Sequence, residues 1–179
     1  KVVRLLPPLI FSEAEAADLA HEHESLPQFL HRQALALRLS ELDRAALHFL
    51  IESLNDDGYL TETLPELAQT LLNDSDIESD DYAELIHRFT VARHLLHSLE
   101  PTGVGAHGLA ECLTLQLQAL QQDPAACAQL AADPAAVRVA LCACQQPLEW
   151  LARRDVRRLM QACRAPEERV RAALGLIAR

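Results

Sequence analysis

Residues 39–60 read LSELDRAALHFLIESLNDDGYL, a helical pattern that ends in a turn. Ser40 is a favourable helix N-cap and Asp43 occupies the capping-box position, which predicts a helix from Ser40 to about Leu54. Its polar side chains fall within one narrow stripe, so we expect most of this helix to be buried. The stripe consists of Glu41, Arg44, His48, Glu52 and Asn55.

Two turn segments punctuate the chain, one directly after this helix and one at residues 100–106. The first contains Gly58, which adopts a positive φ readily in a turn. The second reads EPTGVGA, and a proline with two glycines in so short a stretch predicts a boundary between structural units. The residues assigned to these turns are Asn55, Asp56, Asp57, Gly58, Pro101, Gly103 and Gly105.

The composition indicates helices throughout the chain. Leu and Ala supply 63 of the 179 residues, whereas aromatic residues make up only 4%. Because Leu and Ala favour helices, and strands are enriched in β-branched and aromatic residues, we expect an all-α protein built of two small helical bundles. The expected units are a linker over residues 1–24, a four-helix subdomain over 25–99, a connecting turn over 100–105 and a subdomain of three or four helices over 106–179.

Capping residues, prolines and apolar periodicity place the other helices. In the first half we expect them over about residues 25–39 and 64–72, and from 79 to the proline at 101. In the second half we expect helices over about 107–121, from 155 and from 166, and an alanine-rich stretch that Pro124, Pro134 and Pro147 interrupt.

Gln116 lies on the helix expected over residues 107–121, at the centre of a largely leucine stripe. An unpaired buried amide costs on the order of 1–3 kcal/mol. We therefore predict that Gln116 is buried and hydrogen-bonded to nearby backbone or side chain. The alternative is that this edge of the helix faces a gap between the two subdomains.

The two halves of the chain differ in charge. Residues 1–100 contain 7 Lys or Arg against 19 Asp or Glu, and residues 101–179 contain 9 Arg against 7 acids. An acidic half of this size repels nucleic acid, so the chain lacks the electrostatic footprint of a stand-alone DNA-binding protein.

Four arginines cluster around the start of a helix, where the helix dipole disfavours cations. They are Arg153, Arg154, Arg157 and Arg158. Two explanations remain open. Either an acidic partner or a nucleic-acid backbone contacts them, or they pair within the chain with acids of the other half.

We find no pattern of catalytic or metal-binding residues. His94 and His97 share a helix but lack a third ligand at a helical step, and His48 has no nucleophile nearby. Cys142 and Cys144 point to opposite sides of a helix, and we expect all five cysteines to be free thiols. The sequence predicts no enzymatic activity, no cofactor and no metal. Because no signal peptide or transmembrane segment is evident, we expect a cytoplasmic protein.

Two blocks of the sequence resemble the core-binding region of sigma-54 factors, the alternative bacterial sigma class of the nitrogen-regulation type. They are LSELDRAALHFLIESLNDDGYL at residues 39–60 and LEPTGVGAHGLAECLTLQL at residues 99–117, in the order and spacing of that family. The resemblance covers roughly residues 26–179. The chain departs from the family at Glu100, usually Asp, at His107, usually Arg, and over residues 122–147, which match poorly.

The resemblance implies an all-α region of two subdomains that binds core RNA polymerase, including the β-flap. In that family the full factor forms a holoenzyme at promoters with elements near -24 and -12, and an ATP-driven activator acts on it before the promoter opens. The activator-responsive, helix-turn-helix and promoter-reading segments find no match here, so we expect an excised core-binding domain that contacts promoter DNA only through other parts of the full factor. A generic helical adaptor for another protein is the alternative, and it leaves both blocks unexplained.

Overall fold

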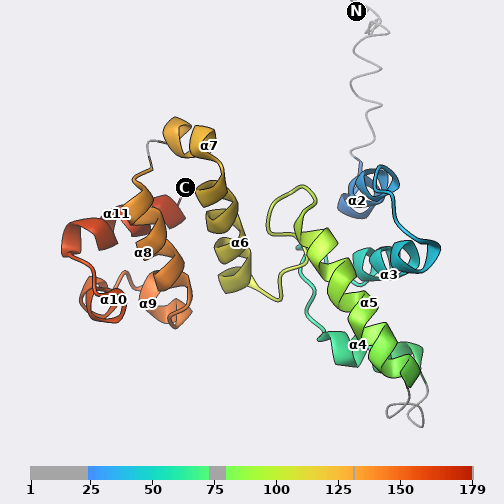
Figure 1. Ribbon diagram of the computed structural model, residues 1–179. Coiled ribbons are helices and arrows are strands. Elements are labelled where there is room, and N and C mark those ends of the chain that lie inside the picture. The colour runs from blue at the N-terminus through green and yellow to red at the C-terminus, as the bar shows by residue number, and fades with distance from the viewer. Residues whose placement is uncertain (1–23, 73–79, 131, 179) are drawn as a thin grey trace, which may run out of the picture.

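The computed structural model describes residues 24–72, 80–130 and 132–178. Within them the chain is helical with connecting turns and contains no strand, so the expected all-α class is confirmed (Figure 1). The linker expected over residues 1–24 and the helix start expected at residue 79 lie outside the described residues, apart from Glu24. The described helices are α2 (Leu26–Leu35), α3 (Glu41–Glu52), α4 (Leu64–Leu71), α5 (Asp80–His97), α6 (Leu109–Gln122), α7 (Pro124–Gln129), α8 (Pro134–Cys144), α9 (Leu148–Ala152), α10 (Val156–Cys163) and α11 (Glu167–Ile177).

Side-chain caps fix the starts of the first helices. The Ser40 hydroxyl accepts a hydrogen bond from the Asp43 backbone N–H, as the sequence predicts for α3. Helix α2 ends at Leu35, earlier than expected. Leu37 and Leu39 both pack against the core, which a continued helix would prevent because it separates residues two apart by about 200°.

The core of the first half lies between α3 and α5. The Phe49 and Phe89 rings stack with their centroids 5.4 Å apart, and Leu50 and Leu96 are fully buried beside them. The expectation that α3 is largely buried holds for its apolar face, but His48 is half-buried where the sequence predicted an exposed residue. The reason is α2, whose His31 ring lies edge-on to the His48 ring at 4.6 Å.

The second half packs around α8, the alanine-rich helix. Ala136, Ala140 and Ala143 are buried there, and their small side chains let α6 and α11 approach closely. The prolines of this stretch do more than interrupt it: Pro124 and Pro134 each occupy the first turn of a helix. That position suits proline because its missing N–H has no partner there in any case.

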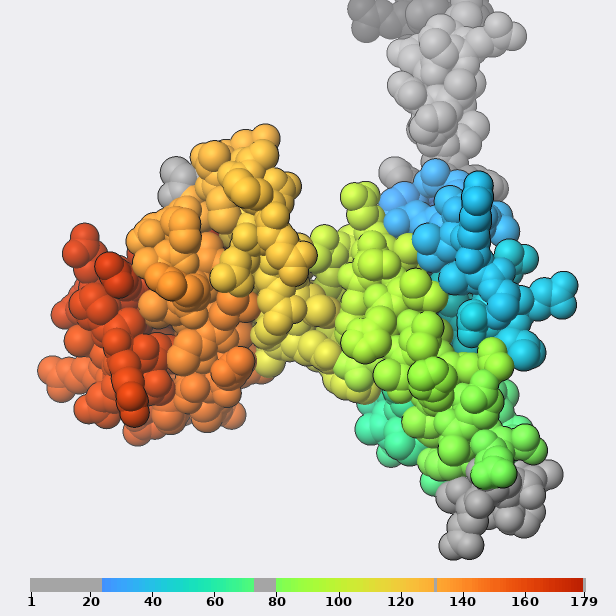
Figure 2. All heavy atoms as spheres, in the orientation of Figure 1, coloured from blue at the N-terminus to red at the C-terminus, as the bar shows by residue number. Residues whose placement is uncertain are grey.

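The two sets of helices form two masses joined at a narrow waist (Figure 2). One core comprises buried residues from Leu30 to Val104, and the two smaller cores comprise residues from Leu117 to Ala173. The loop between α5 and α6 passes through the waist (Figure 1). This loop contains the second turn segment, residues 100–106, so the arrangement of the two masses depends on what holds that loop.

Candidate functional site

The two turn segments meet at the junction between α5 and α6, although more than forty residues separate them in the sequence. The Gly105 N–H donates to the Gly58 carbonyl at 2.9 Å, and the Leu60 N–H donates to the Ala106 carbonyl at 2.9 Å. Residues 103–106 are all buried. The turn after α3 and the loop before α6 therefore form one hydrogen-bonded unit, which we call the junction.

Glycine is required where these backbones approach each other. Gly58 has φ +78° and Gly105 has φ +74°, in the left-handed region that disfavours other residues. A Cβ at Gly105 would lie 2.5 Å from Leu96 Cδ2, and one at Gly58 would lie 2.9 Å from Leu26 Cδ2. The close packing of the junction thus depends on the absence of these two side chains.

Asn55 shapes the first turn, in which the sequence predicts it together with Asp56, Asp57 and Gly58. Its carboxamide oxygen accepts hydrogen bonds from the Asp57 N–H at 3.0 Å and the Tyr59 N–H at 2.9 Å. An asparagine that bonds backbone two residues ahead is an Asx-turn, which is the signal that identifies it in the sequence. The carboxylates of Asp56 and Asp57 are exposed and make no hydrogen bond in the described part of the chain.

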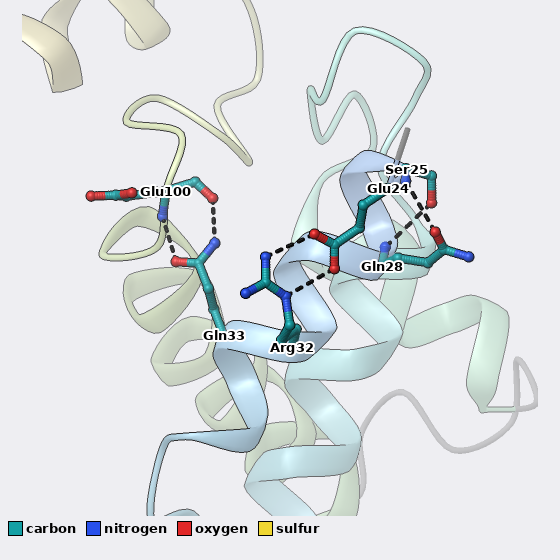
Figure 3. Close-up of polar contacts among 6 residues, drawn as sticks. All are labelled: Glu24, Ser25, Gln28, Arg32, Gln33 and Glu100. Carbon is teal, nitrogen blue, oxygen red and sulfur yellow. Dashed lines mark hydrogen bonds and ion pairs between the residues drawn. The ribbon is translucent and has the colours of Figure 1, made fainter. Parts of the chain in front are cut away.

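Gln33 of α2 clamps the loop before α6. Its carboxamide donates to the Glu100 carbonyl at 2.6 Å and accepts from the Glu100 N–H at 2.9 Å (Figure 3). Arg32, also of α2, pairs with the Glu24 carboxylate just before the helix, beside the Ser25–Gln28 capping box (Figure 3). The Gln33 side chain thus satisfies both backbone groups of Glu100 and holds this loop residue in place, whatever the Glu100 side chain does.

An ion pair joins α5 to α6 across the junction. The Arg93 guanidinium contacts the Glu111 carboxylate, which also accepts a hydrogen bond from the His107 N–H at 2.8 Å. Burial of Glu111 raises its pKa, but the His107 N–H and the Arg93 charge outweigh burial and lower the pKa below its usual value. The ionised form of Glu111 is therefore the one that stabilises the junction.

Gln116 is exposed, so the prediction that it is buried was wrong. Its hydrogen bonding was predicted correctly, because the amide donates to the Thr102 carbonyl at 3.2 Å. Leu117 next to it is buried against α8, whereas Gln116 borders a cavity of about 490 Å³. This cavity lies beside α6, α7 and the end of α11, so the leucine stripe of α6 is only partly covered.

The four clustered arginines do not all behave alike. The Arg158 guanidinium lies 5.5 Å from the centroid of the Trp150 ring and 3.3 Å from the Asp155 carboxylate. Arg153, Arg154 and Arg157 are exposed, and their guanidinium groups make no hydrogen bond or ion pair among the described residues. The described part of the chain thus contains no pairing of this cluster with acids of the other half.

The described residues contain no group of three or more His, Cys, Asp or Glu side chains placed to hold a metal ion. His94 is exposed, and the half-buried His97 bonds the Gly105 carbonyl at 3.2 Å as part of the junction. All five cysteines are free thiols, as expected. No helix of the described chain has the length and apolar character that crossing a bilayer requires.

The whole of the helical region matches one family of proteins. The family model described as "Sigma-54 factor, core binding domain" matches residues 15–179. The chain belongs to the sigma-54 family. Among curated relatives, the RNA polymerase sigma-54 factor of Pseudomonas aeruginosa is 32% identical over 154 residues, and that of Bacillus subtilis is 32% identical over 102 residues.

These matches cover part of each relative. The region aligned with the Pseudomonas aeruginosa factor is 86% of this chain and 28% of that factor. The region aligned with the Bacillus subtilis factor is 57% of this chain and 21% of that factor. This sigma-54 core-binding domain therefore spans about a quarter of the length of the relatives that it matches. A core-binding domain is part of a transcription initiation factor and not an enzyme, and the match disfavours the alternative of a generic helical adaptor.

Glu100 and His107, which differ from the residues that the resemblance leads us to expect, both lie in or next to the junction. At position 100 the clamp from Gln33 holds only backbone atoms of Glu100. At position 107 the His107 Nδ1 lies 2.6 Å from the Leu60 carbonyl oxygen and links the two sequence blocks. Both blocks that carry the resemblance thus contribute residues to the same junction.

Proposed function

We propose that this chain binds core RNA polymerase as the core-binding region of a sigma-54 type initiation factor. The observation that carries the proposal is the family match over residues 15–179. The full factor, of which the chain would be one part, would form the holoenzyme in the cytoplasm and direct activator-dependent transcription from -24/-12 promoters. The ATP-driven activator would act on that full factor, and promoter DNA would be read by other segments.

The arrangement of the helices supports a division of the region into two subdomains, over residues 25–99 and 106–179. The separate hydrophobic cores and the waist between them favour this division. We propose that the junction, including the loop over residues 100–105, fixes the angle between the subdomains. Both would then meet the polymerase, with the β-flap as one contact, in a preset orientation that lowers the entropic cost of binding.

The exposed arginines at the start of α10 are our candidates for a contact with the polymerase. Arg153 and Arg157 have no acidic partner in the described part of the chain, so their charges are available to an acidic protein surface. Arg154, also free, completes this surface, whereas Arg158 is engaged with Asp155 and Trp150 and contributes less. Opposite charges across an interface mainly raise the association rate and fix orientation.

Size-exclusion chromatography with purified bacterial core polymerase tests the main proposal. We expect the chain to co-elute with core enzyme as a stoichiometric complex and to be displaced by a full-length sigma-54 factor. Elution of the folded chain only at its own volume, at micromolar concentrations of both proteins, would contradict the proposal.

Charge reversal tests the arginine surface separately. We expect Arg153→Glu with Arg157→Glu to weaken core binding about tenfold at low salt, with a smaller loss at high salt because exposed charges are screened. The matched control is the double change to Lys, which keeps both charges and should bind like the unaltered chain. Equal affinity of the Glu and Lys variants would remove these arginines from the interface while leaving core binding itself intact.

A further inference from the structure

A second group of arginines surrounds a hollow between α8, α10 and α11, apart from the start of α10. Arg138 comes from α8, Arg164 caps the C-terminal end of α10 and Arg169 comes from the first turns of α11. All three residues line one open hollow of about 180 Å³. Three separate elements therefore bring three arginines to the border of one hollow.

No acid neutralises these three arginines within the described residues. Arg138, Arg164 and Arg169 are exposed, and their guanidinium groups make no ion pair or hydrogen bond there. The nearest acids in the sequence are Glu167, which pairs with Arg171 at 2.6 Å, and Glu168, which does not line the hollow. Three uncompensated cations at one hollow repel one another, so an anion in the hollow would relieve that repulsion.

The other residues that line the hollow include no acidic side chain. They contribute small apolar side chains and the thiols of Cys142 and Cys163. Burial and a hydrogen bond with Cys142 raise the pKa of Cys163 to about 12, so this thiol is uncharged at neutral pH. The hollow is thus lined by three cations and by neutral groups.

The backbone of Arg164 adopts a strained, left-handed conformation. Arg164 has φ 49° and ψ 42°, a left-handed conformation at a helix C-terminus where glycine is the usual residue. A non-glycine residue in this conformation costs roughly 1 kcal/mol. Glycine would be less strained at this position, so Arg164→Gly removes the guanidinium group without straining the fold.

We propose that this hollow binds a phosphate group, and that the phosphate belongs to the backbone of a nucleic acid that passes the domain. A phosphate presents oxygen acceptors in several directions, so it can receive forked guanidinium donors from three sides. A single carboxylate has two oxygens and one charge, which matches one arginine better than three. Binding would be independent of base sequence, because phosphate contacts position a protein and carry no sequence information.

This phosphate site goes beyond polymerase binding and does not rest on it. The acidic first half of the chain opposes binding, so affinity would be weak and would fall steeply with salt. A bound polymerase that brings nucleic acid close would compensate for the low affinity by raising the effective concentration. The isolated chain nevertheless offers a direct test at low ionic strength.

The test compares two arginine-to-glycine variants that remove the same charge. Arg164→Gly removes a guanidinium next to the hollow, whereas the control Arg38→Gly alters an exposed residue of the first half, after the end of α2, that does not line the hollow. Both variants should fold, which thermal unfolding by circular dichroism checks. The probes are a labelled duplex of arbitrary sequence, inorganic phosphate and polyglutamate.

We expect Arg164→Gly to weaken duplex binding about fivefold at about 50 mM salt and to reduce the slope of log K against log salt by about 1. Arg38→Gly should leave both unchanged. In heteronuclear NMR spectra, the duplex and millimolar phosphate should shift the same backbone amides, those around Arg138, Arg164 and Arg169. Agreement of these measurements supports the site and its nucleic-acid source.

Three results would overturn the proposal. Equal losses in the two variants would mean that the duplex responds to diffuse charge and not to this hollow. Tighter binding of polyglutamate than of a duplex of equal charge, at the same amides, would assign the hollow to an acidic protein. Shifts with inorganic phosphate but none with the duplex would assign it to a free phosphorylated ligand. None of these results bears on whether the chain binds core polymerase.

Discussion

At the scale of single residues, the junction depends on positions where no side chain is tolerated. We predict that Gly105→Ala destabilises the fold by about 2–4 kcal/mol, because alanine is strained at φ +74° and its Cβ would overlap Leu96. The control is Gly175→Ala in α11, where nothing lies within 4 Å of an added Cβ. There alanine should stabilise by about 0.5–1 kcal/mol. Chemical denaturation measures both, and similar free energies of unfolding for the two variants would contradict the close packing at Gly105.

The Gln33 clamp leads to a second residue-scale prediction. Gln33→Leu removes both hydrogen bonds to Glu100 and leaves the rest of α2 unchanged. We expect faster amide hydrogen exchange at Glu100 and a loss of about 1–3 kcal/mol, since two backbone groups lose their partner. Leu35→Gln, on an exposed residue of the same helix, is the control and should alter neither quantity. Unaltered exchange at Glu100 in Gln33→Leu would mean that water satisfies this backbone equally well.

Residue-scale features were only partly predictable from the sequence. Gly58 and Gly105 were identified as turn residues, because proline, glycine and asparagine mark turns locally. Their tight contacts with Leu26 and Leu96 were not, since those contacts join elements far apart in the chain. The prediction that Gln116 is buried was wrong for the same reason. The helical periodicity of the sequence gives the face on which a residue lies, but not whether another helix covers that face.

At the scale of elements, the link between α5 and α6 is a pH-sensitive one. The pKa of Glu111 is lowered in the folded chain, so its contribution to stability is present above its unfolded pKa of about 4.5 and is lost as the pH falls through the lower folded value. The pKa of His97 is lowered as well, mainly by burial, so protonation of His97 below about pH 6.5 also favours unfolding. Both groups make acid loosen the junction.

We therefore predict that the melting temperature falls as the pH drops from 7 towards 3, and that Glu111→Gln flattens the part of this fall below about pH 4.5. The Glu111→Gln variant should be less stable than the unaltered chain at pH 7 and closer to it at pH 3, because only the ionised carboxylate pairs with Arg93. The control is Glu62→Gln, at an exposed carboxylate without a hydrogen bond in the described chain, which should keep the original pH profile. Parallel profiles for Glu111→Gln and the unaltered chain would exclude this ion pair as the pH-sensitive contact.

Element boundaries were predictable where a local signal existed. Ser40 marks a helix start because capping acts within one turn. The prolines at 124 and 134 were expected only to interrupt an alanine-rich stretch, whereas each lies in the first turn of a helix. The early end of α2 had no such signal. It follows from burying both Leu37 and Leu39 against the same core, which is a tertiary requirement.

At the scale of the whole molecule, charge and fold together predict what the isolated chain does in transcription. Residues 1–100 carry twelve more acids than bases, so phosphate repels this half, and the phosphate site proposed on the second half reads no sequence. At physiological salt we expect no preference for a -24/-12 promoter over a scrambled duplex. Core binding, in contrast, needs only the protein surfaces that the two sets of helices present.

Competition follows from that separation of roles. Added in excess, the chain should occupy core polymerase without being able to read a promoter, and should inhibit sigma-54-dependent transcription in a reconstituted assay with full-length factor and activator. ATP hydrolysis by the activator should be unchanged, because the chain acts on the polymerase and not on the activator. Raising the concentration of full-length factor should restore transcription if both proteins compete for one surface. Inhibition that excess factor fails to reverse, or promoter-specific binding by the chain alone, would show that these roles are divided differently.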